Sequence, residues 1–213
     1  MAILERGFKA WSERTSLAVR KELRLHVSDA LAPDRLADHL SVRLATPQGI
    51  EDMATSDLDQ LLKHDPWGWS AVTVINDSET LVIYNPNRSV GRRASDITHE
   101  LAHLVLGHEP GTIVLSEHGT MAMRSFNQKQ EDEANWLAWS LLLPREGLVV
   151  AVSRGDSDEQ IAATFGVTET LVRFRKRLTG VERQSRALRR PKTSRATPQA
   201  ESNRTGSRST RAR

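Results

Sequence analysis

Residues 98–103 read Thr98-His99-Glu100-Leu101-Ala102-His103, the pattern H-E-x-x-H. In an α-helix, residues four apart lie only about 40° apart around the axis, so His99 and His103 would direct their imidazoles at one point. Glu100 would lie beside them, where it can hold a metal-bound water. Two imidazoles and a carboxylate, with a fourth position open to water, are typical ligands of catalytic zinc. A chain with seven His in 213 residues gives only roughly 0.02 matches to this pattern by chance. The pattern therefore predicts a zinc-dependent hydrolase.

The residues around the motif predict a helix with two distinct faces. Its apolar residues recur at helical spacing and form one stripe, which predicts burial on that side; they are Val90, Ala94, Ile97, Leu101, Leu104 and Val105. His99, Glu100 and His103 fall outside this stripe. We expect the helix to begin after Ser89, a favourable N-cap residue, and to stop at Gly107. The metal-binding side chains would then lie away from the core side of the helix.

The net charge is unevenly distributed along the chain. Residues 183–213 hold ten Lys or Arg and one acidic residue, a net charge of +9, and subtracting it from the +3 of the whole chain leaves −6 for residues 1–182. The high isoelectric point therefore belongs to the tail and does not indicate that the domain binds nucleic acid. The remaining length is sufficient for one main domain with a hydrophobic core.

Cysteine usage and hydropathy indicate the compartment. The sequence has no cysteine, which excludes disulfides and thiolate metal ligands and fits a reducing environment. Its first residues lack the apolar run of a signal peptide, and no window reaches the apolar length of a membrane span. We expect a cytoplasmic protein with no membrane partner.

Hydrophobic patterning predicts the elements that surround the motif. Helices are expected at residues 4–28, 35–40, 55–62, 90–106, 129–143 and 146–152, and strands at residues 41–45, 70–75, 80–84 and 112–115. A turn at residues 76–79 would join strands 70–75 and 80–84 into a hairpin. Residues 109–127 form a long connection, so we expect them to border the cleft.

A zinc site of this kind needs a third protein ligand. The extended pattern H-E-x-x-H-x-x-G-x-x-H is not met, because the chain has Leu106 and Glu109 where that pattern requires Gly and His. His108 lies nine residues after His99, which is about 180° away on a straight helix. We interpret His108 as a helix-end residue that interacts with the C-terminal dipole.

The following helix offers carboxylates for this role, namely Glu131, Asp132 and Glu133. Glu131 shares one helix face with Asn135 and Ala138, whereas Glu133 falls on the opposite side. We therefore choose Glu131 as the third ligand over the other two, and we expect Asn135 to hydrogen-bond a ligating histidine. The competing interpretation is an exposed acidic helix start that the helix dipole favours.

Three segments carry a resemblance to a known family. They are Ser-Asp-Ile-Thr-His-Glu-Leu-Ala-His-Leu-Val-Leu-Gly-His (95–108), Val-Ile-Tyr-Asn-Pro (82–86) and Gln-Glu-Asp-Glu-Ala-Asn-Trp-Leu-Ala-Trp-Ser-Leu-Leu-Leu-Pro (130–144). Together they resemble the ImmA/IrrE family of metallopeptidases. One departure is Leu137, where the family commonly has Phe.

The resemblance implies a gluzincin-like site, in which His99, His103 and Glu131 bind Zn²⁺ and Glu100 is the base. It implies an α+β fold with a zincin-like metallopeptidase domain, which contains a small antiparallel sheet, the HExxH helix and the following glutamate-bearing helix. Family members cleave helix-turn-helix repressors, so a helix-turn-helix transcriptional repressor is the expected protein substrate.

The expected chemistry is metal-assisted peptide hydrolysis. Zn²⁺ polarises the scissile carbonyl, and Glu100 takes a proton from the zinc-bound water and later passes it to the leaving amine. A residue that stabilises the oxyanion is also expected, and the candidates are His118 and Tyr84. An extended substrate would pair with an edge strand of the hairpin at residues 70–84.

The C-terminal part carries a second pattern. Residues 157–178 resemble a helix-turn-helix, with Ala in the first helix and Gly166 in the turn. A basic run follows that could contact phosphates, namely Arg173, Arg175, Lys176 and Arg177. We prefer packing of a small helical subdomain, or substrate recruitment, over DNA reading. The tail from Arg183 cannot bury enough apolar surface to fold; a weak contact with nucleic acid is the alternative to a purely solvated tail.

The sequence thus predicts four parts. They are an N-terminal helix (1–30), the zincin-like metallopeptidase domain (31–153), a helical helix-turn-helix-like part (154–182) and a basic disordered tail (183–213). The leading hypothesis is a zinc metallo-endopeptidase that acts on a regulatory protein. The alternatives are a DNA-binding regulator and a toxin–antitoxin-type module, each with a non-catalytic zinc site. Glu100 favours the enzyme, because a purely structural site does not require a base.

Overall fold

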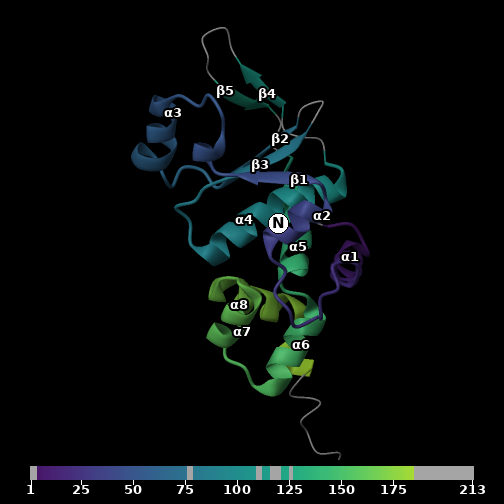
Figure 1. The fold of residues 1–213 in the computed structure, drawn as a ribbon. Helices are drawn as coiled ribbons and strands as arrows, with labels where there is room; N and C mark the ends of the chain where they lie inside the picture. The colour runs from purple at the N-terminus through teal and green to yellow at the C-terminus, as the bar shows by residue number, and fades with distance from the viewer. Residues whose placement is uncertain (1–3, 76–78, 109–111, 116–120, 125–126, 185–213) are drawn as a thin grey trace, which may run out of the picture.

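A computed structural model describes residues 4–75, 79–108, 112–115, 121–124 and 127–184, and it shows a mixed α+β fold (Figure 1). Between residues 109 and 126 the description is limited to the backbone of two strands. The helices are α1 (Phe8–Glu22), α2 (Pro33–His39), α3 (Thr55–Asp59), α4 (Val90–Leu106), α5 (Gln128–Leu142), α6 (Arg145–Arg154), α7 (Asp158–Phe165) and α8 (Glu169–Thr179), with short helical turns η1 (Pro47–Gly49) and η2 (Gln60–His64). The predicted α+β class is confirmed, and a helix overlaps each predicted range, although the helix expected at residues 4–28 spans only Phe8–Glu22 and the one expected at residues 55–62 continues from Asp59 as η2.

The sheet next to the motif helix has three strands in the order β1-β3-β2. They are β1 (Val42–Ala45), β2 (Ala71–Ile75) and β3 (Thr80–Tyr84). β2 and β3 form the predicted antiparallel hairpin, but β1 joins β3 in parallel. Parallel neighbours need a crossover connection, which here runs through η1, α3, η2 and β2. β2 is therefore an edge strand of the described sheet.

A second antiparallel pair follows α4 in the chain. It consists of β4 (Thr112–Leu115), which was predicted, and β5 (Met121–Arg124), which was not.

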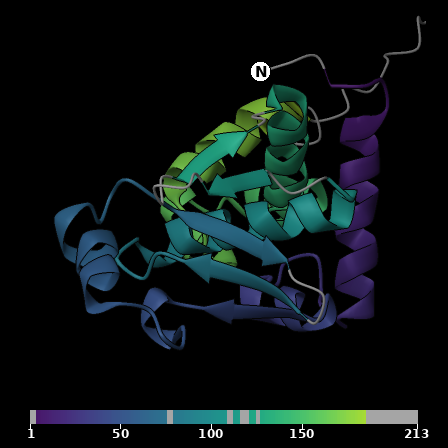
Figure 2. The same ribbon diagram turned by 90° about the horizontal axis from the view of Figure 1, so that it is seen from above.

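The elements form successive layers around α4. α4 contacts β2 and β3 on one side and packs along α5, which in turn packs against α1; Figure 1 shows the sheet on one side of α4 and the α6–α8 helices at the opposite end. Seen from above, α1 runs along one side of this arrangement (Figure 2). The main core contains fully buried side chains from each layer, including Leu36, Val82, Leu101, Leu137 and Leu141.

The buried surface of α4 is wider than its apolar stripe. Ala94, Ile97 and Leu101 are buried as predicted, whereas Val90, in the first turn, is 68% exposed. Thr98 and Ala102 lie outside the predicted stripe and are completely buried. The cause is that α4 lies between two partners, the sheet and α5, whereas the apolar stripe predicts burial on one side only.

A second core joins α6, α7 and α8 to the end of α5. Its fully buried members include Leu142, Leu143, Leu148, Ile161 and Val172. The two helices expected in this part are present as α7 and α8, with a capping box at the start of α7 and Gly166 in the left-handed region between them. A Cβ atom at Gly91 would lie 2.7–2.8 Å from backbone atoms of Val167 and Thr168, so the start of α4 packs directly on this turn.

Buried arginines fasten α1 and α8 to the end of α5. The completely buried Arg175 donates Nε and Nη2 to the carbonyl of Leu143 and places Nη2 2.6 Å from Glu13 Oε1. Arg20, also buried, donates Nη2 to the Leu141 carbonyl at 2.9 Å. Arg175, one of the four basic residues that could have contacted phosphates, is not available for such a contact, because its guanidinium is used inside the fold, as the preferred packing interpretation predicts.

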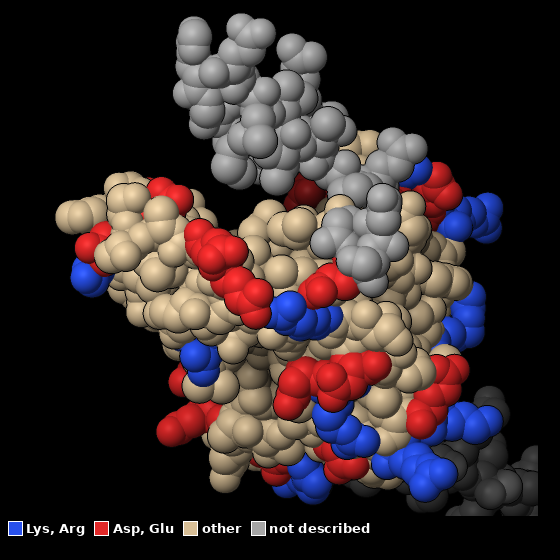
Figure 3. All heavy atoms as spheres, turned by 45° about the horizontal axis from the view of Figure 1, so that its top comes forward, with Lys and Arg blue, Asp and Glu red and all other residues tan. Residues whose placement is uncertain are grey.

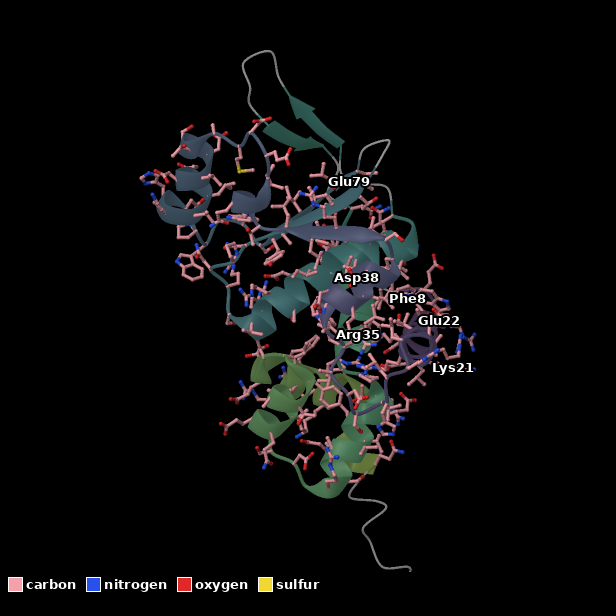
Figure 4. All side chains as sticks on the ribbon, in the orientation of Figure 1. Phe8, Lys21, Glu22, Arg35, Asp38 and Glu79 are labelled. Atoms are coloured by element: carbon pink, nitrogen blue, oxygen red, sulfur yellow. The ribbon has the colours of Figure 1, made fainter. Side chains whose placement is uncertain are left out.

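Polar contacts also join α1 to α2. Arg35 donates to the carbonyl of Leu23 at 2.8 Å, and His39 lies 3.0 Å from Glu22; Figure 4 labels Glu22 and Arg35 at this junction.

Within the described part of the chain, no single helix has the length and hydropathy of a membrane span; α5 and α6 meet that criterion only as a pair bent by 46°.

Candidate metal centre

Three side chains from α4 and α5 converge on one point. His99 Nε2 and His103 Nε2 are 3.1 Å apart. Glu131 Oε2 lies 3.2 Å from His99 Nε2, and its Oε1 lies 3.5 Å from His103 Nε2. Donors held by one tetrahedral Zn²⁺ at its usual bond lengths would be about 3.3 Å apart. The three residues chosen from the sequence therefore have the chemistry and the spacing to hold one such ion.

Two local features bring Glu131 to the motif helix. The side chain of Asn127 accepts hydrogen bonds from the backbone N–H groups of Lys129 and Gln130, which caps α5 and places Glu131 in its first turn. The small residues Ala134 and Ala138 are almost completely buried where α5 packs along α4. Small side chains let two helix backbones approach closely, so the carboxylate can reach both imidazoles.

Glu100 lies beside this group and is fixed by the sheet. Its Oε2 accepts a hydrogen bond from Thr73 Oγ1 at 2.6 Å. Thr73 is opposite the buried Val82 in the β2–β3 register, so both side chains share the face that α4 covers. Burial raises the pKa of Glu100, with a smaller upward contribution from Glu131, while the bond from Thr73 and the nearby His99 lower it. Burial prevails, so the carboxylate is more basic than an exposed one.

Thr73 is a site residue that the sequence analysis did not identify. Strand alternation places it on one face of β2 but cannot show which helix covers that face.

The geometry corrects the interpretation of His108. Its Nδ1 lies 2.9 Å from His103 Nδ1, and its Nε2 lies 3.3 Å from Glu133 Oε2. The expectation that it lies on the far side of α4 is wrong, because α4 ends at Leu106 and the chain does not continue as a straight helix. Gly107 takes a left-handed conformation with φ 63° and turns the chain back, so that His108 lies over the last turn. Glu133 does lie apart from Glu131, as predicted, but its carboxylate faces His108.

The other candidates from the sequence take different places. Asn135 donates Nδ2 to the backbone carbonyl of Glu131 at 2.8 Å. This bond lies within α5, one turn from Glu131, and does not reach a histidine. Asp132 is buried and accepts a bond from Gln128 at 3.2 Å. Tyr84 packs against the main core and does not belong to the lining of the cavity beside the triad. His118 lies outside the described residues. The oxyanion residue stays a prediction.

A cavity of about 480 Å³ extends from the triad to α8. His99 and Glu131 form one end, and α8 contributes Thr170, Phe174 and Arg177 to its wall. Trp139 of α5 also lines it and meets Phe174 edge to face, with ring centroids 4.7 Å apart. One face of α8, from its first turn to its last, therefore lines the cavity.

The wall of the cavity on α4 carries a buried carboxylate. Asp96 is 8% exposed and pairs with Arg92 at 3.0 Å. Burial raises its pKa, while Arg92 and two neighbouring basic groups lower it.

Charges on the visible surface are mixed. On the face shown in Figure 3, the described Lys and Arg side chains are interspersed with Asp and Glu. Nucleic-acid-binding surfaces instead gather Lys and Arg into one basic stripe. The face shown has no such stripe among its described residues.

Comparisons with known proteins identify the family. Residues 51–177, more than half of the chain, match Peptidase_M78, the IrrE N-terminal-like domain. Among solved structures, a Mycobacterium tuberculosis transcriptional regulator matches with a TM-score of 0.46 and 14% sequence identity, over 81% of this chain and 47% of that chain. This chain thus spans less than half the length of that regulator. No curated protein matches the sequence. The resemblance inferred from the motifs is confirmed, and the chain belongs to the IrrE N-terminal-like Peptidase_M78 family.

Proposed function

We propose that this protein is a zinc-dependent endopeptidase that cleaves a regulatory protein, with a helix-turn-helix transcriptional repressor as the expected substrate. The observation that carries the proposal is the spacing of His99, His103 and Glu131 next to the buried Glu100. A site that only stabilised the fold would have no use for a basic carboxylate held at this position. The family match supports a metallopeptidase.

The three ligands would hold Zn²⁺, which when bound supplies a Lewis acid that polarises a peptide carbonyl and makes water more acidic. Glu100 accepts the proton of the attacking water and delivers it to the departing amine. The raised pKa of Glu100 lies closer to neutral pH than that of an exposed carboxylate. This suits a group that must both take the proton from water and give it to the amine. Thr73 holds one carboxylate oxygen by its hydrogen bond, which leaves the other oxygen to act as the base.

The surroundings of the site suggest how a polypeptide would bind. β2 is an edge strand of the described sheet, and Thr73 brings it into contact with Glu100. An extended segment of substrate can add to such an edge through backbone hydrogen bonds. The cavity between α4, α5 and α8 can then receive one of its side chains. These two features favour a protein substrate over a small molecule.

The test compares the wild type with Glu100→Gln on purified helix-turn-helix repressors. We expect the wild type to cleave a repressor, and Glu100→Gln to bind the same amount of Zn²⁺ but lose cleavage by at least about a hundredfold, the scale of a lost general base. Glu159→Gln, an exposed change on α7, is the matched control and should cleave normally. Full cleavage by Glu100→Gln would exclude the mechanism.

The non-catalytic alternative predicts a different result. If the protein were a DNA-binding or toxin–antitoxin-type regulator with a structural zinc site, no repressor would be cleaved, and Glu100→Gln would leave DNA or partner binding unchanged.

A further inference from the structure

We propose that His108, held in place by Glu133, is a positioning residue that fixes the ring tautomer of His103, so that the Nε2 lone pair of His103 faces the metal. This inference rests on the proposed metal site. It assigns a role to His108 and Glu133, which are not ligands, and to the contact between His108 and His103.

With His108 neutral, the hydrogen-bond chain has one self-consistent direction. The carboxylate Glu133 can only accept, so His108 donates its Nε2 proton to Glu133 Oε2, 3.3 Å away. A neutral His108 then carries a lone pair on Nδ1. That atom is 2.9 Å from His103 Nδ1, which must therefore carry the proton and donate it. With its proton on Nδ1, His103 has a free lone pair on Nε2, the atom that faces His99 and Glu131.

The backbone builds this contact into the end of α4. The N–H of Gly107 bonds the carbonyl of Leu104, and the N–H of His108 bonds the carbonyl of His103 at 3.0 Å. These two bonds form a Schellman motif, which lays the second residue after the helix over its last turn. His108 thus meets His103 through both backbone and side chain, and the two rings pack edge to face with centroids 5.0 Å apart.

The contact is shielded from solvent on both sides. The side chains of His108 and Glu133 are only 8% and 13% exposed. Lys129 Nζ lies 3.8 Å from the other oxygen of Glu133. Water therefore competes poorly for His103 Nδ1, and the ring is held in one orientation.

The two histidines of the proposed site differ in whether their Nδ1 atom has a hydrogen-bond partner. The Nδ1 atom of His99 is buried and has no hydrogen-bond partner among the described residues. The fixing of a ring tautomer through Nδ1 therefore applies to His103 and not to His99.

The first experiment measures Zn²⁺ affinity against a competing chelator. His108→Leu removes the acceptor while keeping similar bulk, and we expect the affinity to fall on the order of 10- to 100-fold, as when other partners of ligating histidines are removed. In His108→Asn the side-chain oxygen can occupy the place of Nδ1, so affinity should return to within about threefold of the wild type. Wild-type affinity in His108→Leu, or equal losses in both variants, would overturn the proposal.

The second experiment reads the tautomers directly by long-range ¹H–¹⁵N NMR of the metal-free protein at pH 8. We expect the His103 proton on Nδ1 in the wild type and in His108→Asn. His108→Leu should lose this preference. A wild-type His103 with its proton on Nε2 would refute the assignment. If the wild type bound no Zn²⁺, the proposed function would fail, while the tautomer would still decide whether this contact orients His103.

Discussion

Acid should destabilise the metal-free protein through His103. Burial lowers the pKa of this imidazole to about 4, with smaller contributions from the neighbouring His99 and His108, against 6.5 for an unperturbed histidine. The unfolded chain therefore takes up this proton near pH 6.5 and the folded chain only near pH 4. Between these values the unfolded state binds more protons, so stability falls as the pH drops through this window.

The size of the effect follows from the difference between the two pKa values. Each pKa unit corresponds to about 1.4 kcal/mol, so the full loss below pH 4 is on the order of 3 kcal/mol. At pH 5 about 2 kcal/mol of this stability is already lost. This is a large share of the roughly 5–15 kcal/mol that stabilises a typical domain.

The assay is urea unfolding of the wild type and of His103→Gln at pH 8 and pH 5, with a chelator present throughout. Glutamine stays neutral, so the variant lacks this one proton and keeps the other titrating groups. We expect the wild type to lose about 2 kcal/mol more than the variant between the two pH values. Equal losses in both proteins would refute the reasoning, because they would mean that His103 titrates alike in the folded and unfolded states.

Three further changes test other parts of the structure. Thr73→Val removes the hydroxyl that donates to Glu100, so the pKa of Glu100 should rise further and the acidic limb of the kcat/KM profile should move up by about one pH unit; an unmoved limb would exclude this contact in the active enzyme. Gly107→Ala meets no atom within 4 Å but places Ala at φ 63°, so urea unfolding should show a loss of about 1 kcal/mol with Zn²⁺ binding retained; lost binding would contradict this. Arg175→Met leaves Glu13, whose side chain is 16% exposed, without its charged partner and should cost about 3 kcal/mol, part of which Glu13→Gln should restore; a loss under about 1 kcal/mol would count against a buried pair.

Local patterns were sufficient for much of the site. The motif fixes the spacing of His99 and His103 on a helix, and helix periodicity separates Glu131 from Glu133. Both inferences use geometry within one helix, where backbone hydrogen bonds leave little freedom. The structure places these side chains as that geometry predicts.

The remainder depends on contacts between distant segments. Arg175 belongs to a basic run, and only its pairing with Glu13, 162 residues earlier in the chain, shows that it is buried. Thr73 reaches Glu100 across a sheet–helix contact that strand alternation does not specify. The parallel β1–β3 pair also joins segments that are not neighbours in the chain.

His108 is a different case, because the sequence did contain the signal. A straight helix was assumed to continue past Gly107, but glycine after a helix is typical of a Schellman motif. That motif lays the next residue back over the last turn, so the approach of His108 to His103 could have been predicted.

The central claim is that His99, His103 and Glu131 together hold one metal ion. The most direct test is a Zn²⁺ titration of the metal-free protein against a competing chelator, with Glu131→Ala beside the wild type. We predict one equivalent of tightly bound Zn²⁺ for the wild type and a loss of affinity of at least about a hundredfold for Glu131→Ala, since removing a ligand should cost no less than removing the hydrogen-bond partner of a ligand. Wild-type affinity in Glu131→Ala, or no bound Zn²⁺ in the wild type, would contradict the account.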